Sequence, residues 1–270
     1  MPGLGKRLLT AGVVLPPVLL AIYFGPKLMA VLLAAFALWG AREMVRLHRV
    51  RGLQVPAWLP GAGALILIVS YSGWIGIGVA AGLLLVVLVG IITELFRRNG
   101  SMLSGLPVVV LGSVYLGLLP AHLLRFYDLG RVGRPDPWPV YYALLLIWGC
   151  DTAAYGIGSI LGRHKLWPRV SPSKSWEGAA AGLVGSVLLA VAFGRWVPGL
   201  SLGAQIGAGI LVGVASQLGD LAESLMKREA ATKDSGGFFP GHGGVLDRLD
   251  SIILAAPVLY YWLRWTLRVS

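Results

Sequence analysis

Residues 75–96 read IGIGVAAGLLLVVLVGIITELF, and Glu94 is the only charged residue in this stretch. Arg97 and Arg98 follow directly. A helix crosses the hydrocarbon core of a bilayer with about 20 apolar residues. This stretch therefore predicts a transmembrane helix that ends at a basic border.

The composition of the whole chain supports the same interpretation. Of its 270 residues, 56% are hydrophobic and only 13% are charged, and the mean hydropathy is +0.76. A soluble domain carries about 25% charged residues. A single water-soluble core is therefore excluded, and we expect an all-α polytopic integral membrane protein.

Apolar runs separated by Gly, Pro and charged residues predict nine transmembrane helices. The third and fourth are divided only by a short Ser-Gly-Trp break. The predicted spans are about 8–25, 28–47, 57–73, 75–96, 102–126, 138–160, 177–197, 200–224 and 250–267. Pairs of small residues four apart, Gly178/Gly182 and Gly209/Gly213, predict close helix packing.

Acidic residues divide the chain into two parts. Residues 1–125 contain only Glu43 and Glu94, whereas eight of the twelve acids fall between residues 151 and 250. We therefore expect an N-terminal transmembrane scaffold of about five helices over residues 1–126. Residues 127–270 would form a C-terminal catalytic transmembrane domain of about four helices plus cytoplasmic loops.

The formal net charge of +11 would suggest a nucleic-acid partner in a soluble protein. Here the basic residues flank apolar spans, where they face anionic lipid headgroups, so no nucleic acid is expected. With the N-terminus in the cytoplasm, the nine spans place sixteen Lys and Arg residues inside and seven outside. This bias predicts a cytoplasmic N-terminus and a C-terminus on the opposite side. We also expect the protein to reside in a bacterial cytoplasmic membrane.

Four aspartates lie inside or at the ends of predicted spans, where each charge costs about 2.5–3.5 kcal/mol on insertion scales. They are Asp151, Asp220, Asp247 and Asp250. We expect them to converge toward the cytoplasmic side. Alternative interpretations stay open: Asp247 and Asp250 could cap a helix start, and Asp220 could form a salt bridge with a neighbouring base.

Two local patterns point to phosphate chemistry. Asp220, Ser224 and Lys227 follow the spacing i, i+4 and i+7, which places them on one helix face. The segment KREAATKDSGGFFPGHGGVLDR, residues 227–248, joins glycines to Lys and Arg, which suit phosphate oxygens. It is not a P-loop, because GxxxxGK[ST] is absent from the chain. Clustered carboxylates call for a divalent cation, and Mg²⁺ prefers oxygen ligands shared with substrate phosphates.

Residues 224–250, SLMKREAATKDSGGFFPGHGGVLDRLD, resemble the signature of the phosphatidate cytidylyltransferase (CDP-diacylglycerol synthase) family. Two upstream segments, DTAAY at 151–155 and SPSKSWEG at 171–178, are also similar to family segments. The recognisable motifs cover roughly residues 148–250. The first 125 residues match only in being hydrophobic.

The resemblance implies an enzyme that transfers a cytidylyl group from CTP to phosphatidic acid, giving CDP-diacylglycerol and pyrophosphate. It implies catalytic roles for Asp220, Asp247, Lys227 and Asp250, with Asp220 and Asp247 as Mg²⁺ ligands; a second cation is left open. The residues expected to bind substrate are Ser224, Arg228, Lys233, Asp234, His242, Gly243, Gly244, Arg248, Asp151, Ser171 and Lys174.

For His242 the resemblance suggests a hydrogen bond to phosphate, and a turn-stabilising role is the alternative. By family analogy the protein would be a homodimer in the bilayer, with its active site facing the cytoplasm.

Three other functions stay open at this point. An ion-coupled transporter would explain Asp151 and Asp220 but not the basic, glycine-rich segment. A related enzyme could act on another lipid phosphate, since no motif specifies the lipid tail. A non-catalytic scaffold would have no use for the clustered acids.

Overall fold

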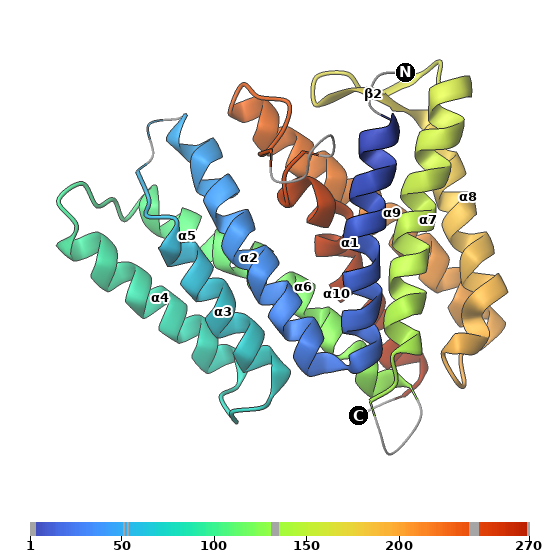
Figure 1. The fold of residues 1–270 in the computed structure, drawn as a ribbon, viewed down its shortest axis with the longest axis horizontal. Helices are drawn as coiled ribbons and strands as arrows, with labels where there is room; N and C mark the ends of the chain where they lie inside the picture. Colours follow the sequence, from blue (N-terminus) through green and yellow to red (C-terminus); the bar gives the residue numbers. More distant parts are fainter. Residues whose placement is uncertain (1–3, 51, 53, 131–134, 238–242, 269–270) are drawn as a thin grey trace. The chain divides into compact units, whose positions relative to one another are not determined.

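A computed structural model describes residues 4–50, 52, 54–130, 135–237 and 243–268, with side chains from residue 12 onward (Figure 1). The chain forms two compact units. Unit 1 comprises Met1–Leu124 and Glu229–Arg248, and unit 2 comprises Arg125–Arg228 and Leu249–Ser270. The chain therefore leaves unit 1 after Leu124, returns to it for the 20-residue segment Glu229–Arg248, and then leaves it again.

Unit 1 is built around α3. Its helices are α1 (Leu4–Phe24), α2 (Pro26–Arg49), α3 (Trp58–Ser72), α4 (Val79–Phe96) and α5 (Gly105–Ser113), followed by a π-helical turn (Val114–Leu118), α6 (Leu119–Ala121) and a 3₁₀ turn (His122–Leu124). Helix α3 packs against α2, α4, α5 and the π-helical turn. A Cβ on Gly117 would lie 2.6 Å from the Ala64 Cα, so glycine permits this close crossing.

Unit 2 pairs long helices with a short β-ribbon. Its elements are a 3₁₀ turn (Phe126–Leu129), α7 (Trp138–Leu161), β1 (Lys165–Trp167), β2 (Ser171–Ser175), α8 (Trp176–Phe193), a 3₁₀ turn (Gly194–Trp196), α9 (Leu202–Glu229) and α10 (Leu246–Thr266). The last residue of α9, Glu229, and the first three residues of α10 belong to unit 1. The strands are antiparallel, and Lys165 pairs with Ser175. The predicted all-α class is confirmed, and this ribbon between α7 and α8 is an addition to it.

Small residues set the close approach of the helices in unit 2. A Cβ on Gly182 of α8 would lie 3.0 Å from the Cys150 carbonyl oxygen on α7. A Cβ on Gly209 of α9 would lie 2.5 Å from the Val187 Cα on α8. The packing role predicted for these glycines is confirmed.

Six helical segments are long and apolar enough to cross a membrane within the part of the chain that the structure describes. They are Pro26–Arg49, Val79–Phe96, Gly105–Leu129, Trp138–Leu161, Trp176–Trp196 and Leu202–Glu229. Each matches one of the nine predicted spans. The other three predicted spans correspond to α1, to the 15-residue α3, and to α10, which carries charged residues at its start. The sidedness of the chain stays a prediction.

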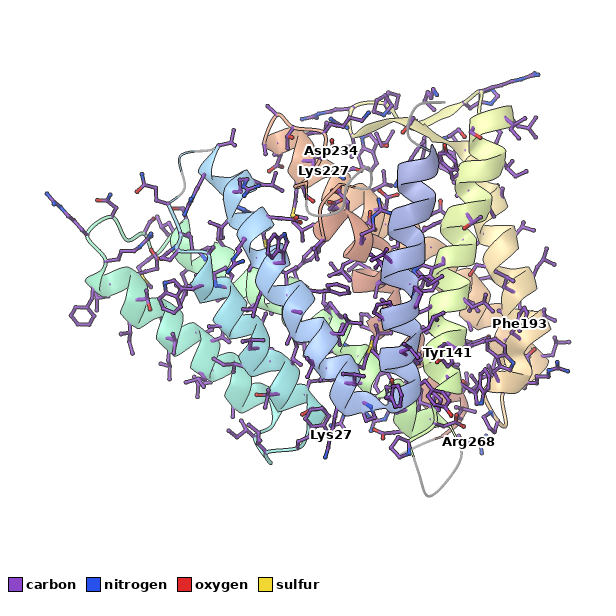
Figure 2. All side chains as sticks on the ribbon, in the orientation of Figure 1. Lys27, Tyr141, Phe193, Lys227, Asp234 and Arg268 are labelled. Carbon is purple, nitrogen blue, oxygen red and sulfur yellow. The ribbon has the colours of Figure 1, made fainter. Side chains whose placement is uncertain are left out.

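Aromatic side chains gather at one end of α7 and α8, where Tyr141 and Phe193 are labelled in Figure 2. The ring of Trp138 lies 5.1 Å from that of Trp196 and 5.6 Å from that of Tyr141. Phe193 lies 4.8 Å from Trp196. Such clusters are typical of helix ends at a membrane interface.

Candidate active site

Asp220, on α9, has a basic partner from the β-ribbon. The Lys174 Nζ lies 2.6 Å from the Asp220 Oδ2, with the two side chains 23% and 34% exposed. The Ser224 hydroxyl donates to the Asp220 Oδ1 at 3.4 Å, as the shared helix face predicted. The salt bridge considered for Asp220 is therefore present, and it brings Lys174 from β2 to this carboxylate.

Three aspartates from different helices meet in unit 2. Asp250 on α10 interacts electrostatically with Asp220 on α9 and with Asp151 on α7, and the Lys227 ammonium group opposes the charge of Asp250. The Asp151 Oδ1 accepts a hydrogen bond from the Ser251 hydroxyl at 3.2 Å. These interactions link three of the four aspartates that the sequence singled out, while their convergence toward the cytoplasmic side stays a prediction. Gly219 makes it possible, because a Cβ there would collide with the Asp250 carbonyl oxygen.

The next turns of α9 hold a buried ion pair and a second link to the ribbon. The Lys227 Nζ lies 2.6 Å from the Oε2 of Glu223, whose side chain is fully buried. The exposed Arg228 donates from its Nε to the Val170 carbonyl at 3.2 Å, next to the buried Ser171 of β2. Sequence reasoning gave Glu223 no role, although an acid four residues before Lys227 is a recognisable helix pair.

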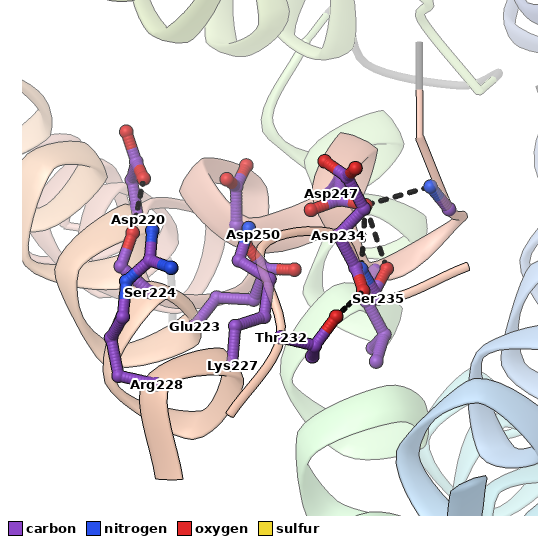
Figure 3. Close-up of polar contacts among 12 residues, drawn as sticks. Asp220, Glu223, Ser224, Lys227, Arg228, Thr232, Asp234, Ser235, Asp247 and Asp250 are labelled. Carbon is purple, nitrogen blue, oxygen red and sulfur yellow. Dashed lines mark hydrogen bonds and ion pairs between the residues drawn. The ribbon is translucent and has the colours of Figure 1, made fainter. Parts of the chain in front are cut away.

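Asp247 lies in unit 1, at the start of α10, where its Oδ2 accepts three hydrogen bonds (Figure 3). The donors are the Ser235 hydroxyl at 2.8 Å, the Ser235 N–H at 3.2 Å and the Gly244 N–H at 2.7 Å. Gly243 has a φ of +81°, and a Cβ there would lie 2.6 Å from the same oxygen. The helix-start role considered for Asp247 is therefore present, because this carboxylate organises the turn that precedes α10.

The other residues predicted in this segment are not among the donors to the Asp247 carboxylate given above. Lys233, Asp234 and Arg248 are exposed, and the Thr232 hydroxyl donates to the Asp234 backbone carbonyl at 3.2 Å. His242 lies outside the described residues.

Asp220 belongs to unit 2 and Asp247 to unit 1. Their joint action on one cation stays a prediction.

Glu43 was assigned to the scaffold by sequence, but it contacts the segment that precedes α10. It lies on α2, 2% exposed, and its Oε2 accepts from the Leu246 N–H at 3.0 Å and the Ser235 hydroxyl at 3.3 Å. No motif marks this glutamate. The available signal was its position inside a predicted span, where an acid requires a partner.

Carboxylate oxygens are the kind of ligand that Mg²⁺ prefers, but few of them lie together among the residues that the structure describes. Within the described residues, no group of three or more His, Cys, Asp and Glu side chains is arranged to hold a metal ion. Mg²⁺ commonly takes only one or two protein carboxylates and completes its coordination with waters and substrate phosphates. Asp220 already has a cationic partner, Lys174, in the structure, and its role as a Mg²⁺ ligand stays a prediction.

Comparison with known proteins gives a consistent result. The model of the "Cytidylyltransferase family" matches residues 5–266. A protein of Staphylococcus aureus (strain COL) named phosphatidate cytidylyltransferase is 29% identical over 256 residues, covering 94% of this chain and 96% of the relative. A protein of the same name from Bacillus subtilis (strain 168) is 37% identical over 57% of this chain and 57% of the relative. Another, from Staphylococcus epidermidis (strain ATCC 12228 / FDA PCI 1200), is 30% identical over 86% of this chain and 87% of the relative.

Proposed function

Because the chain belongs to the cytidylyltransferase family, we propose that it transfers the cytidylyl group of CTP to phosphatidic acid, giving CDP-diacylglycerol and pyrophosphate. The observation that carries this proposal is the meeting of Asp151, Asp220 and Asp250 beside Lys174 and Lys227 in unit 2. The names of the relatives support phosphatidic acid as the acceptor.

The proposed reaction depends more on neutralising the negative charge of its substrates than on a general base. The second pKa of a phosphate monoester is near ~6, so the phosphate of the lipid is already anionic at neutral pH. One of its oxygens attacks the α-phosphorus of CTP and forms a new P–O bond. The bond between the α-phosphorus and the oxygen that bridges it to the β-phosphate breaks, and pyrophosphate leaves. Two polyanions must be brought together, which requires cationic groups.

The residues divide into two chemical groups in this proposal. Asp220 and Asp247, with Asp250, would hold Mg²⁺, which supplies positive charge to the triphosphate. Lys174, Lys227 and Arg228 of unit 2 would contact the phosphates, as would Lys233 and Arg248 of unit 1. Dimerisation and a cytoplasmic active site are further parts of the proposal that rest on family resemblance and charge distribution.

The decisive experiment measures incorporation of radiolabelled CTP into chloroform-soluble product by the purified protein, with and without phosphatidic acid. We expect label only with phosphatidic acid and Mg²⁺ or Mn²⁺, and none in excess EDTA. If label appears only with an isoprenoid lipid phosphate, that lipid and not phosphatidic acid is the acceptor. Solute flux into liposomes without CTP consumption would favour a transporter and contradict the proposal.

A further inference from the structure

Glu43 of α2 contacts the segment Ser235–Asp247 of the same unit. This segment carries Asp247, to which we assign a role in the proposed reaction. Glu43 is 2% exposed, and burying such a charge is costly unless donors surround it. Its Oε2 accepts from the Leu246 N–H and the Ser235 hydroxyl, at 3.0 and 3.3 Å. Its Oε1 is buried without a hydrogen-bond partner among the described residues.

Two glycines let the backbone of this segment pack directly on the Glu43 carboxylate. A Cβ on Gly244 would lie 2.5 and 2.6 Å from its two oxygens. A Cβ on Gly236 would collide with the Oε1. Any larger side chain at these positions would push the segment away from α2, so the segment and Glu43 fit each other closely.

Ser235 links the two carboxylates. Its hydroxyl lies 2.8 Å from the Asp247 Oδ2 and 3.3 Å from the Glu43 Oε2. Leu246, which donates its N–H to Glu43, is the first residue of α10. Asp247 follows it directly. Glu43 therefore satisfies a backbone donor at the helix start that would otherwise lack a partner, and shares a hydroxyl with the neighbouring acid.

We infer that Glu43 is a positioning residue, which fixes Gly244, Leu246 and the Asp247 carboxylate in the orientation that the reaction uses. The catalytic part of this inference rests on the proposed function, and the anchoring part does not. Glu43 itself would touch neither CTP nor lipid. Its charge and length matter because both hold the start of α10 to α2.

The test compares Glu43→Gln with Glu94→Gln. Glu94 is a matched control, because it is 3% exposed, lies in the same unit, accepts from the Ser101 N–H at 2.8 Å and pairs with Arg97 at 2.6 Å. Hydrogen exchange of the full-length protein in lipid nanodiscs is measured together with kcat and KM for CTP. We expect Glu43→Gln to speed exchange of the Ser235, Gly244 and Leu246 amides about tenfold and to lower kcat at least tenfold, with a smaller change in KM. Glu94→Gln should speed exchange only near Ser101 and keep kcat within about twofold.

A second variant, Ser235→Ala, keeps the test decisive if Glu43→Gln fails to fold, because by itself it should speed exchange of the Gly244 amide and lower kcat. Where both variants fold, their effects on kcat should be less than additive, since both release the same segment. Wild-type exchange in both variants would overturn the anchoring. Faster exchange with an unchanged kcat would overturn the role in catalysis. A wild-type protein without CTP-dependent activity would refute the proposed function, while the exchange data would still decide the anchoring.

Discussion

The Lys174 ammonium group on β2 lies 2.6 Å from the Asp220 carboxylate on α9. This ion pair makes the short ribbon between α7 and α8 part of the acidic cluster in unit 2. The hydrogen bond from Arg228 to the Val170 carbonyl fastens the same ribbon to α9 a second time. The ribbon is thus a structural support for the cluster as well as a source of one of its basic residues.

Replacing Lys174 tests this arrangement. Lys174→Gln should lower kcat/KM for CTP by about tenfold or more, because a charge-assisted contact is worth roughly 1.5–3 kcal/mol and 1.4 kcal/mol is a factor of ten. The control is Lys165→Gln, on the exposed first strand of the same ribbon. Both are measured by CTP incorporation into lipid. Equal kinetics for the two variants would remove Lys174 from the site.

Asp247 is expected to be essential while the protein stays folded. Asp247→Asn preserves the shape that accepts hydrogen bonds from Ser235 and Gly244 but removes the negative charge. We predict at least a ~100-fold loss of CTP-dependent turnover, with a normal elution profile in detergent. Asp128→Asn, at an exposed acid, is the control and should be active. A near wild-type rate in Asp247→Asn would leave this residue only its role at the helix start.

The Lys227–Glu223 pair allows stability and chemistry to be separated. Lys227→Met leaves the fully buried Glu223 without its ionic partner, which costs about 3–5 kcal/mol. We expect a clear drop in the midpoint of thermal unfolding in detergent. The double variant Glu223→Gln/Lys227→Met should recover most of that stability yet stay inactive, because we place Lys227 at the substrate phosphates. Recovery of activity along with stability would make Lys227 a purely structural residue.

Sidedness can be measured with introduced cysteines, since the single native cysteine, Cys150, is buried. The positive-inside bias predicts that Asn99→Cys, at an exposed position after α4, reacts with an impermeant maleimide only after cells are permeabilised. Asp128→Cys, in a segment expected outside, should react in intact cells. The reverse labelling pattern would invert the predicted topology.

The sequence predicted helix positions well where apolar runs are long. The predicted spans 138–160, 177–197 and 200–224 correspond to α7, α8 and α9 within a few residues. Helix α4 begins at Val79 instead of residue 75, because Gly73 and Gly76 adopt left-handed backbone angles that end one helix and delay the next. Relations within one helix, such as Asp220 with Ser224, were equally predictable from spacing.

Contacts between distant segments were not predictable. Glu43 and Ser235 are 192 positions apart, and nothing in either local pattern predicts their hydrogen bond. The same holds for Lys174 with Asp220 and for Ser251 with Asp151. These partners depend on which helices cross and how closely, and small residues such as Gly209 and Gly219 determine that only once the helices are packed.

The sequence by itself determined that this chain is a helical membrane protein of the cytidylyltransferase family, because hydropathy, helix periodicity and a dense motif are local properties. Only the tertiary structure decided the partners of each acid: Lys174 for Asp220, Lys227 for Glu223, and the Ser235–Leu246 turn for Glu43. The physical reason is that a charge in an apolar setting must find its counterpart through space, and the packing of helices supplies it.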